Sequence, residues 1–257
     1  MNEEKNGGGI IPITKSRYKT PENFFPIVVD NFFDDSEALV HYGKSLPKEK
    51  VGNQPGKRSK HLWEIDEKLN QAITVKILSC YYDLEYMNIS WRCSNISFHE
   101  IPRFSENKND IRNRGWIHQD NETYSAGKDD FELAGLIYLT PDIDPDSGTS
   151  LYNLKSHQAK NIFTDGQLFD RKEYAKKHIE HEENFKEKLR FQNIFNRLIM
   201  YDTREFHRAN SYYNGDGKDV RLTLAFFIGG IRGSEYPLKR IKNNEYESII
   251  KDQIGKK

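Results

Sequence analysis

After residue 88 the sequence changes from helical periodicity to short β-like runs separated by turns, and this change constrains the fold more than any other feature. The predicted strands are 89–101, 115–120, 131–140, 148–153, 194–201 and 220–229. Turn-forming residues lie between them, most clearly at 141–146 and 214–217. Many short strands of this kind favour a β-sandwich or a barrel.

Helices are predicted before and within this series of strands. Asp34-Asp35-Ser36 offers N-caps to a helix that ends before Pro47. In the segment 62–82, apolar residues recur every four positions, which indicates an amphipathic helix. A third helix, 171–189, pairs opposite charges four residues apart and has a thin apolar stripe, so we expect it on the surface. The expected fold is mainly β with packed helices, the N-terminal helices covering one sheet.

The sequence predicts one folded domain after an N-terminal tail. Residues 1–22 contain three consecutive glycines and no periodicity, which is typical of a flexible tail. Residues 23–257 form the predicted domain, with helical support at about 34–86 and a β core at about 89–230. At 12% aromatic residues, the 257-residue chain has enough apolar surface for a core.

Charge and cysteine content exclude several classes of protein. Lys and Arg number 39, as do Asp and Glu, so no net field attracts nucleic acid or an anionic membrane. No apolar run approaches the roughly 18 residues of a membrane span, and the N-terminus lacks an apolar signal core. Cys80 and Cys93 are too few for a disulfide framework or a four-thiolate zinc site. We expect a cytoplasmic protein with reduced, buried cysteines.

Three His-x-acid patterns are candidates for a metal site: His118-Gln119-Asp120, His178-Ile179-Glu180 and His181-Glu182-Glu183. In a helix, residues two apart point in very different directions, whereas in an extended segment they point the same way. The second and third patterns lie in the predicted charged helix and are interpreted as its solvated face. The first follows a predicted strand, so His118 and Asp120 can bind one metal ion.

A third ligand completes the candidate site. His207, between two predicted strands, is the preferred candidate, and His99, on the strand upstream of His118, is the alternative. Two histidines and one carboxylate with open positions are typical of non-haem Fe(II) oxygenases. A closed zinc site needs four protein ligands and favours thiolates, and neither cysteine is near in sequence.

Arg221 begins an otherwise apolar predicted strand. Alternation places Arg221 and Thr223 on one face and Leu222 and Leu224 on the other. A guanidinium facing the interior needs an anion, and its fork fits a carboxylate. Tyr138 can add a hydroxyl donor to the same carboxylate. The alternatives are a solvent-facing edge position for Arg221 and ordinary strand packing for Tyr138.

Together these residues resemble the Fe(II)/2-oxoglutarate-dependent dioxygenases, whose core is a double-stranded β-helix, or jelly roll. The family pattern of His-x-Asp, a distant His and Arg-x-Ser/Thr is matched by His118–Asp120, His207 and Arg221–Thr223. The segment 133–140 is similar to prolyl-hydroxylase-like members, in which the tyrosine matching Tyr138 holds the far carboxylate of 2-oxoglutarate.

From about residue 25 the chain also resembles an uncharacterised branch of this superfamily that is common in bacteriophages. The shared motifs are Asp-Asn-Phe-Phe at 30–33, Pro-Gly-x-Arg-Ser at 55–59, Tyr-Leu-Thr-Pro at 138–141 and Asn-Arg-Leu at 196–198. For a phage-encoded protein the expected location is the host cytoplasm.

The resemblance implies a cofactor, a cosubstrate and a reaction. His118, Asp120 and His207 are the implied Fe(II) ligands, and Arg221 and Tyr138, with Thr223, the implied 2-oxoglutarate site. Oxygen and 2-oxoglutarate are consumed, succinate and CO2 are released, and a C–H bond of a peptide side chain or a small molecule is hydroxylated. The Asp120 carboxylate occupies the position that halogenating relatives leave for chloride, which favours hydroxylation.

Other functions remain as alternatives. Nucleic-acid demethylases of the superfamily carry a second arginine that 221–227 lacks, so we do not expect a nucleic-acid substrate. The basic clusters 57–60 and 239–242 are interpreted as solvated surface. A non-catalytic jelly-roll binding module and a cupin-like metalloenzyme without 2-oxoglutarate are the alternatives, and neither needs the anion clamp of Arg221. Should Arg221 not bind the anion, Arg197 and Arg208 are the next candidates.

Overall fold

A six-stranded antiparallel sheet forms the centre of the computed structural model, which describes residues 9–10, 23–51, 55–120, 131–155, 171–215, 217, 220–237 and 251–254. In sheet order its strands are β2 (Ile27–Val29), β9 (Leu198–Asp202), β6 (Phe131–Tyr138), β11 (Val220–Gly229), β5 (Cys93–Pro102) and β3 (Lys57–Arg58). The longest pairing joins β11 to β5 over ten residue pairs, so these two strands form the longest continuous part of the sheet.

Two smaller sheets accompany the central one. One has the order β10 (Phe206–Ala209), β7 (Thr149–Leu154) and β8 (Phe185–Phe191). The other joins β1 (Gly9–Ile10), β4 (Ile89–Trp91) and β12 (Arg232–Gly233). The short 3-10 helices η1 (Ile111–Asn113) and η2 (Pro145–Ser147) lie in connecting loops. The mainly β fold predicted from the sequence is confirmed.

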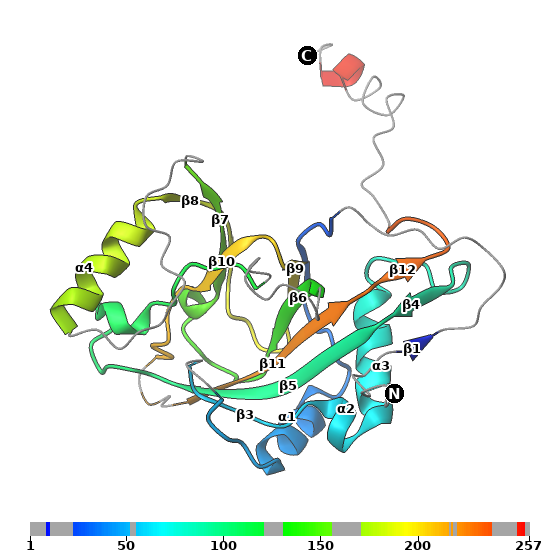
Figure 1. Cartoon of the computed structure of the whole chain (residues 1–257), viewed down its shortest axis with the longest axis horizontal. Coiled ribbons are helices and arrows are strands. Elements are labelled where there is room, and N and C mark those ends of the chain that lie inside the picture. The colour runs from blue at the N-terminus through cyan, green and yellow to red at the C-terminus, as the bar shows by residue number, and fades with distance from the viewer. Residues whose placement is uncertain are drawn as a thin grey trace, which may run out of the picture.

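Helices cover one face of the central sheet. They are α1 (Ser36–Ser45), α2 (Leu62–Ile65) and α3 (Glu67–Leu78), and Figure 1 shows α1 and α2 below β5 and α3 upright near β4. The main apolar cluster between helices and sheet includes Ile73, Ile77, Leu78, Phe98, Leu133, Ile137, Leu224 and Phe226. Because strand side chains alternate, every second residue of β11 is committed to this layer.

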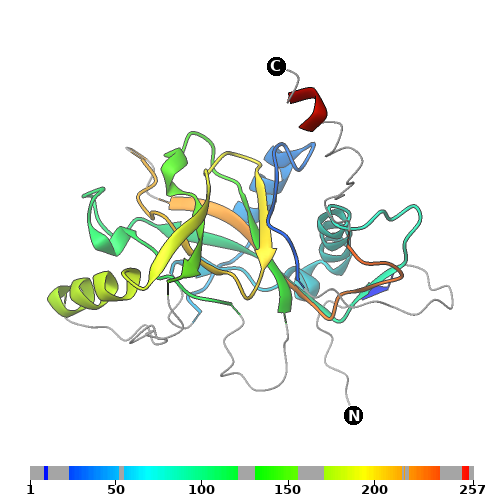
Figure 2. The same ribbon diagram turned by 90° about the horizontal axis from the view of Figure 1, so that it is seen from above.

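The opposite face of the central sheet carries a second, smaller apolar cluster. Its members come from β6, β7, β8 and β9: Ala134, Tyr138, Leu151, Phe191, Ile199 and Tyr201. Figures 1 and 2 show the sheet β10-β7-β8 on this side, with α4 (Arg171–Glu182) at its end. We call the space between the two sheets the interior, and it receives the other half of the β11 side chains.

The predicted helix 62–82 is divided into α2 and α3 at Asp66. The φ of Asp66 is −151°, outside the helical region, and its side chain accepts a hydrogen bond from the backbone N–H of Leu69. Asp66 thus caps a new helix instead of continuing the old one. The first predicted helix is confirmed as α1, with Asp35 as its N-cap.

The predicted helix 171–189 is correct only in its first part. Helix α4 ends at Glu182, and Phe185–Phe191 form strand β8 paired with β7. Both phenylalanines are buried, so their apolar contacts override the helical charge spacing between them. The structure also corrects the predicted strand 115–120, which is not a regular strand: it forms an isolated bridge at His118 and single backbone hydrogen bonds at Gly115 and Asp120.

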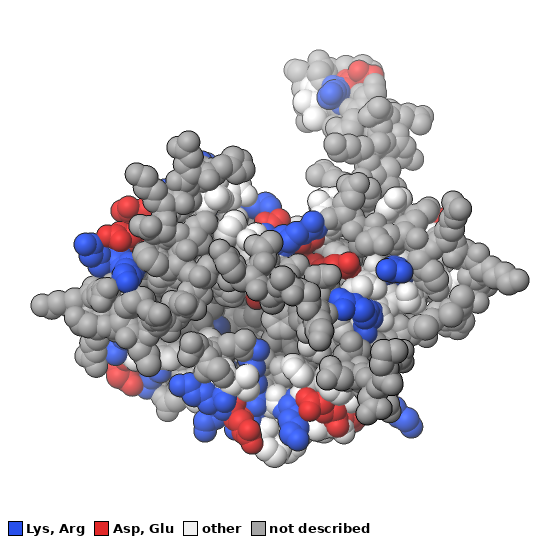
Figure 3. Space-filling view, in the orientation of Figure 1, with Lys and Arg blue, Asp and Glu red and all other residues white. Residues whose placement is uncertain are grey.

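No helix in the described ranges is long and apolar enough to span a membrane. Lysine and arginine side chains are interspersed with acidic ones on the face shown in Figure 3, as expected for zero net charge.

Candidate metal centre and anion site

Backbone pairing brings His118 and His207 together, although 89 positions separate them (207 − 118). The two residues exchange N–H···O=C hydrogen bonds of 3.0 and 2.8 Å, so their side chains lie on the same face of the pair. Gly115 permits this approach, because a Cβ there would lie 2.7 Å from the carbonyl oxygen of Ala209. The two imidazole ring centroids are 4.4 Å apart.

Asp120 faces the same space as the two histidines. Its Oδ1 lies 3.6 Å from Nε2 of His118, and its Oδ2 lies 3.3 Å from Nε2 of His207. One donor atom from each residue can be chosen so that all three lie within 4.8 Å of one another. The side chain of His118 is 44% exposed, against 15% for Asp120 and 8% for His207. A small ligand therefore reaches this group from the side of His118.

Backbone carbonyl groups orient both imidazole rings. Nδ1 of His118 lies 2.8 Å from the carbonyl oxygen of Trp116, and Nδ1 of His207 lies 3.0 Å from that of Glu205. A carbonyl only accepts, so each Nδ1 carries the proton and each Nε2 keeps its lone pair. The lone pairs are directed at the space beside Asp120. This arrangement of neighbours is typical of metal-binding histidines.

The charges of the three residues suit a divalent cation. Burial lowers the pKa of His207, which favours its neutral form. Burial opposes ionisation of Asp120, but His207, His118 and Arg58 together hold the pKa of that carboxyl below its usual value. Two neutral imidazoles and one carboxylate are the donors expected around such a cation.

His99 lies apart from this group. It is on β5, opposite Thr223 of β11, and its Nε2 lies 2.9 Å from Oγ of Ser97. Burial, together with the neighbouring Arg58, holds the pKa of His99 well below its usual value. Of the two candidates for the third ligand, the structure brings His207 to His118 and Asp120.

Arg221 is buried and has no anionic partner in the described part of the chain. Its Nη1 donates to the carbonyl oxygens of Ser147 and Ser211, at 2.7 and 3.1 Å. Its Nε is buried without a hydrogen-bond partner. Burial lowers the pKa of Arg221, opposed by Tyr212 and Tyr138, and the group stays charged at neutral pH. The free Nε edge is the side by which arginine grips a carboxylate.

Tyr138 and Thr223 lie beside Arg221 in the interior. The register of β6 and β11 places Tyr138 directly opposite Thr223, two residues from Arg221 on the same face. Oη of Tyr138 lies 3.0 Å from Oγ1 of Thr149. Burial raises the pKa of Tyr138 to about 12, so its hydroxyl keeps its proton and can donate to an anion.

The two alternative arginines already have carboxylate partners. Nη2 of Arg197 donates to Oδ2 of Asp30 at 2.8 Å, and Arg208 pairs with Glu182 while its Nε donates to Oη of Tyr152 at 2.9 Å. Arg221 is therefore the better candidate for an incoming anion.

The histidines of α4 are not on a solvated face, which corrects the interpretation from sequence. His178 and His181 are fully buried against Trp116. The ring of His181 stacks on the indole at 4.4 Å, and its Nε2 lies 2.7 Å from the carbonyl oxygen of Ile117. Nδ1 of His178 lies 3.2 Å from Oε1 of Glu182. These contacts fix α4 against the segment that carries His118.

Two residues of the interior are not among the site residues predicted from sequence. Tyr201 of β9 packs its ring 4.7 Å from that of His207, and strand alternation gave a signal for its inward direction. Arg58 belongs to a basic cluster that was interpreted as solvated surface. Lys57 and Lys60 are exposed, but Arg58 is half-buried, and its charge lowers the pKa of Asp120.

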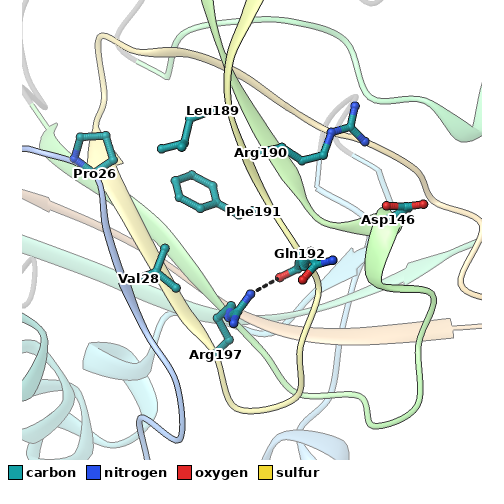
Figure 4. A pocket seen from close by; sticks show the side chains of 8 residues that line it. All are labelled: Pro26, Val28, Asp146, Leu189, Arg190, Phe191, Gln192 and Arg197. Carbon is teal, nitrogen blue, oxygen red and sulfur yellow. Dashed lines mark hydrogen bonds between the residues drawn. The ribbon is translucent and has the colours of Figure 1, made fainter. Parts of the chain in front are cut away.

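Two surface hollows are present, and none of the three donor residues lines either of them. One of about 470 Å³, shown in Figure 4, is lined by Pro26, Val28, Asp146, Leu189, Arg190, Phe191, Gln192 and Arg197. Another of about 620 Å³ is lined by residues around Phe24 and Tyr152. Neither contains a group of possible metal ligands, and the only such group in the described ranges is His118, Asp120 and His207.

Several solved structures are similar to this chain at low sequence identity. A prolyl hydroxylase from Trichoplax adhaerens, in complex with a hypoxia inducible factor peptide fragment, is 14% identical, with 79% of this chain and 83% of that chain covered and a TM-score of 0.44. HygX from Streptomyces hygroscopicus, with nickel and 2-oxoglutarate bound, is 11% identical, with coverages of 79% and 82% and a TM-score of 0.45. The epimerase SnoN, in complex with Fe3+, alpha ketoglutarate and nogalamycin RO, is 10% identical, with coverages of 80% and 80% and a TM-score of 0.46.

These TM-scores are below 0.5, so the site is interpreted from the residues of this chain alone. No curated protein matches the sequence. A family model matches residues 15–228, which is most of the chain, and the protein therefore belongs to the family of unknown function DUF6445.

Proposed function

We propose that the protein is an Fe(II)- and 2-oxoglutarate-dependent dioxygenase that hydroxylates a C–H bond of a peptide side chain or a small molecule. One observation carries this proposal: the interior holds the His118, Asp120 and His207 donors together with the buried Arg221, which has no anionic partner among the described residues. A simple metal site does not require a buried arginine, and a simple anion site does not require three metal donors. The two features together are expected for an enzyme that binds both a metal and an anionic cosubstrate.

The donor set supports Fe(II) in particular. Two imidazole nitrogens and one carboxylate bind one face of an ion and leave its other positions open. The hydrogen bonds from each Nδ1 to a carbonyl oxygen hold His118 and His207 in the required tautomer. The exposed side of His118 leaves a path by which ligands can reach the open positions.

The surroundings of Arg221 support the far carboxylate of 2-oxoglutarate as its anion. Burying an unpaired guanidinium is costly, and a carboxylate on its Nε edge offsets that cost. Tyr138 can donate a second hydrogen bond from the neighbouring strand, where it lies opposite Thr223, two residues from Arg221 on the inner face. Together these groups orient the cosubstrate and keep water from its far end.

When bound, Fe(II), 2-oxoglutarate and O2 supply the oxidation, in which the cosubstrate is decarboxylated to succinate and CO2 and the substrate is hydroxylated. The chain's own residues hold the metal, orient the cosubstrate and exclude water. Asp120 fills a ligand position with a carboxylate, which favours hydroxylation over transfer of a halide.

Two facing antiparallel sheets with inward-pointing functional residues support a double-stranded β-helix core. On this basis we propose that residues 23–257 form one jelly-roll oxygenase domain. Membership of a phage-associated branch and a location in the host cytoplasm are parts of the same proposal.

Ordered calorimetric titrations test the function. We expect Mn(II), a redox-stable substitute for Fe(II), to bind the purified protein first, and 2-oxoglutarate to bind only after the metal. The Arg221→Gln variant retains the metal and loses the cosubstrate. Metal binding without 2-oxoglutarate binding favours the cupin-like metalloenzyme. Binding of neither favours a non-catalytic module. Either of these two results contradicts the proposal.

A further inference from the structure

The Pro55–Ser59 segment is held firmly against β5, and the proposed oxygenase activity assigns no role to it. Gly56 has a φ of +79°, and a Cβ there would lie 2.1 Å from the carbonyl oxygen of Glu100. Only glycine therefore lets this segment lie so close to β5. Ser59 secures the other end, since its N–H donates to the carbonyl oxygen of Phe98 at 2.9 Å and its Oγ accepts from the N–H of Phe98 at 3.0 Å.

The backbone of Arg58 is fixed on both sides. Its N–H and carbonyl oxygen each bond to Glu49 at 2.8 Å, and β3 pairs Arg58 with His99 of β5 on the other side. A residue whose backbone pairs with β-type partners on both sides has a defined side-chain direction. The segment thus positions one particular side chain, that of Arg58.

Strand register shows that this side chain points into the interior. Arg58 lies opposite His99, His99 opposite Thr223, and Thr223 opposite Tyr138. Residues directly opposite one another in antiparallel strands share a face of the sheet. Arg58 therefore lies on the same face of the sheet as Thr223 and Tyr138. Arg221 is two residues from Thr223 on β11, so it lies on this face as well.

Within the described chain, Arg58 makes no ion pair and its Nε is buried without a hydrogen-bond partner. Asp120 is the nearest candidate, but its two oxygens face the imidazoles of His118 and His207. Burial lowers the pKa of Arg58 to about 10, with Asp120 and Tyr212 opposing, so the group is still charged at neutral pH. Arg58 is therefore a half-buried cation that feels the charge of Asp120 but makes no direct ion pair within the described residues.

A count of charges shows that the proposed cofactors do not supply an anion for Arg58. Bound Fe(II) brings two positive charges and Arg221 one. Asp120 brings one negative charge and 2-oxoglutarate two, so these four groups cancel. The positive charge of Arg58 remains, and burial makes an uncompensated charge costly.

We propose that Arg58 binds an anionic group of the substrate, a carboxylate or a phosphate, so that the enzyme acts on an acidic molecule. The assignment of the anion to a substrate rests on the proposed function, but the presence of an anion site at Arg58 does not. The planar guanidinium fits both groups by paired hydrogen bonds.

Calorimetry with simple anions tests the site without knowledge of the substrate. Acetate and inorganic phosphate are titrated separately, at constant ionic strength, into metal-free protein carrying Asp120→Asn and Arg221→Gln, in which the Asp120 charge, the metal and the cosubstrate clamp do not compete. Adding Arg58→Gln is expected to weaken binding of the preferred anion at least tenfold, and Arg58→Lys to weaken it less. Lys57→Gln, at the exposed neighbour, is the matched control and leaves binding unchanged. The anion that binds more tightly shows whether the site prefers a carboxylate or a phosphate.

Equal binding with and without Arg58, including no binding in either case, overturns the inference. A second titration, of 2-oxoglutarate into Mn(II)-loaded protein, is expected to be the same for wild type and Arg58→Gln. If Arg58→Gln weakens 2-oxoglutarate as much as Arg221→Gln does, Arg58 belongs to the cosubstrate site and the inference is wrong. If wild type binds no 2-oxoglutarate while the Arg58-dependent anion site persists, the proposed function fails and the anion site stands.

Discussion

The segment 116–120 and helix α4 carry the same kinds of residues, histidines with acidic neighbours, and use them differently. In the segment, His118 and Asp120 are two residues apart in extended backbone and direct their donor atoms to a shared space. In α4, His178 and His181 lie on one helical face and are buried against Trp116. The pattern of residue types is shared, but the backbone decides whether the side chains face a shared space or pack against the protein.

The two regions also depend on each other. His181 contacts the carbonyl oxygen of Ile117, and Trp116, whose carbonyl oxygen orients His118, stacks on the His181 ring. Helix α4 thus supports the candidate metal centre from behind, and none of its described residues belongs to the donor group. The comparison predicts that changes in the segment abolish ligand binding, whereas changes in α4 reduce stability first.

The largest expected effect is the loss of a metal donor. His118→Ala, Asp120→Ala and His207→Ala are each expected to weaken Mn(II) binding by about a hundredfold or more, because two donors hold an ion poorly. Competition with a fluorescent chelator measures the affinity. His41→Ala, at an exposed position on α1, is the control and keeps wild-type affinity. Full affinity in any of the three variants disproves the donor set.

Arg221→Gln should have the next largest effect, and on the cosubstrate alone. Removing one partner of a buried charge pair costs about 2 kcal/mol or more, which is roughly thirtyfold in the dissociation constant of 2-oxoglutarate. Metal affinity is expected to stay within about twofold of wild type. Arg197→Gln, which changes an arginine already paired with Asp30, is the matched control. Equal losses in both variants would assign the anion elsewhere.

His181→Ala tests the supporting role of α4. The change leaves the carbonyl oxygen of Ile117 without its partner and opens a cavity beside Trp116, so we expect a loss of about 2 kcal/mol in the free energy of unfolding. Metal affinity should fall by about tenfold or less, the lower end of the range for groups that orient a ligand, because His181 acts on His118 only through Trp116. Urea unfolding and the chelator assay measure the two effects. A loss of metal as large as that of His118→Ala would make His181 a ligand.

The smallest effect expected is a pH-dependent one at Glu182. Burial opposes its ionisation, but contacts with His178 and Arg208 lower its pKa to about 2 from 4.5. The folded pKa is depressed, so the stabilisation is fully present above about pH 4.5 and is lost as the pH falls towards 2. Glu182→Gln is expected to cost about 1–2 kcal/mol at pH 7 and almost nothing at pH 2. A difference that is constant with pH would contradict this account.

Much of the site could be predicted from sequence because its determinants are local. Two-residue spacing in extended backbone placed His118 with Asp120, and strand alternation placed Arg221 with Thr223. The geometry agrees with both. The choice between His99 and His207 needed the pairing of distant segments, which no local pattern contains.

The errors have a common physical cause. Charges four residues apart predicted a helix to 189, but burial of Phe185 and Phe191 against β7 required a strand. The charged helix pattern also predicted a solvated face for His178 and His181, and the local basic cluster 57–60 predicted a surface position for Arg58. In each case a long-range contact decided the result, and local propensity is too weak to oppose such contacts.

The most direct test of the central claim is an anaerobic titration of the metal-free protein with Fe(II) and then with 2-oxoglutarate, followed by visible absorption. The account predicts a charge-transfer band of a chelated iron–oxoacid complex in wild type and its absence in His207→Ala. Iron binding without the band in wild type, or an equal band in His207→Ala, would contradict the claim that these three donors and Arg221 form one oxygenase site.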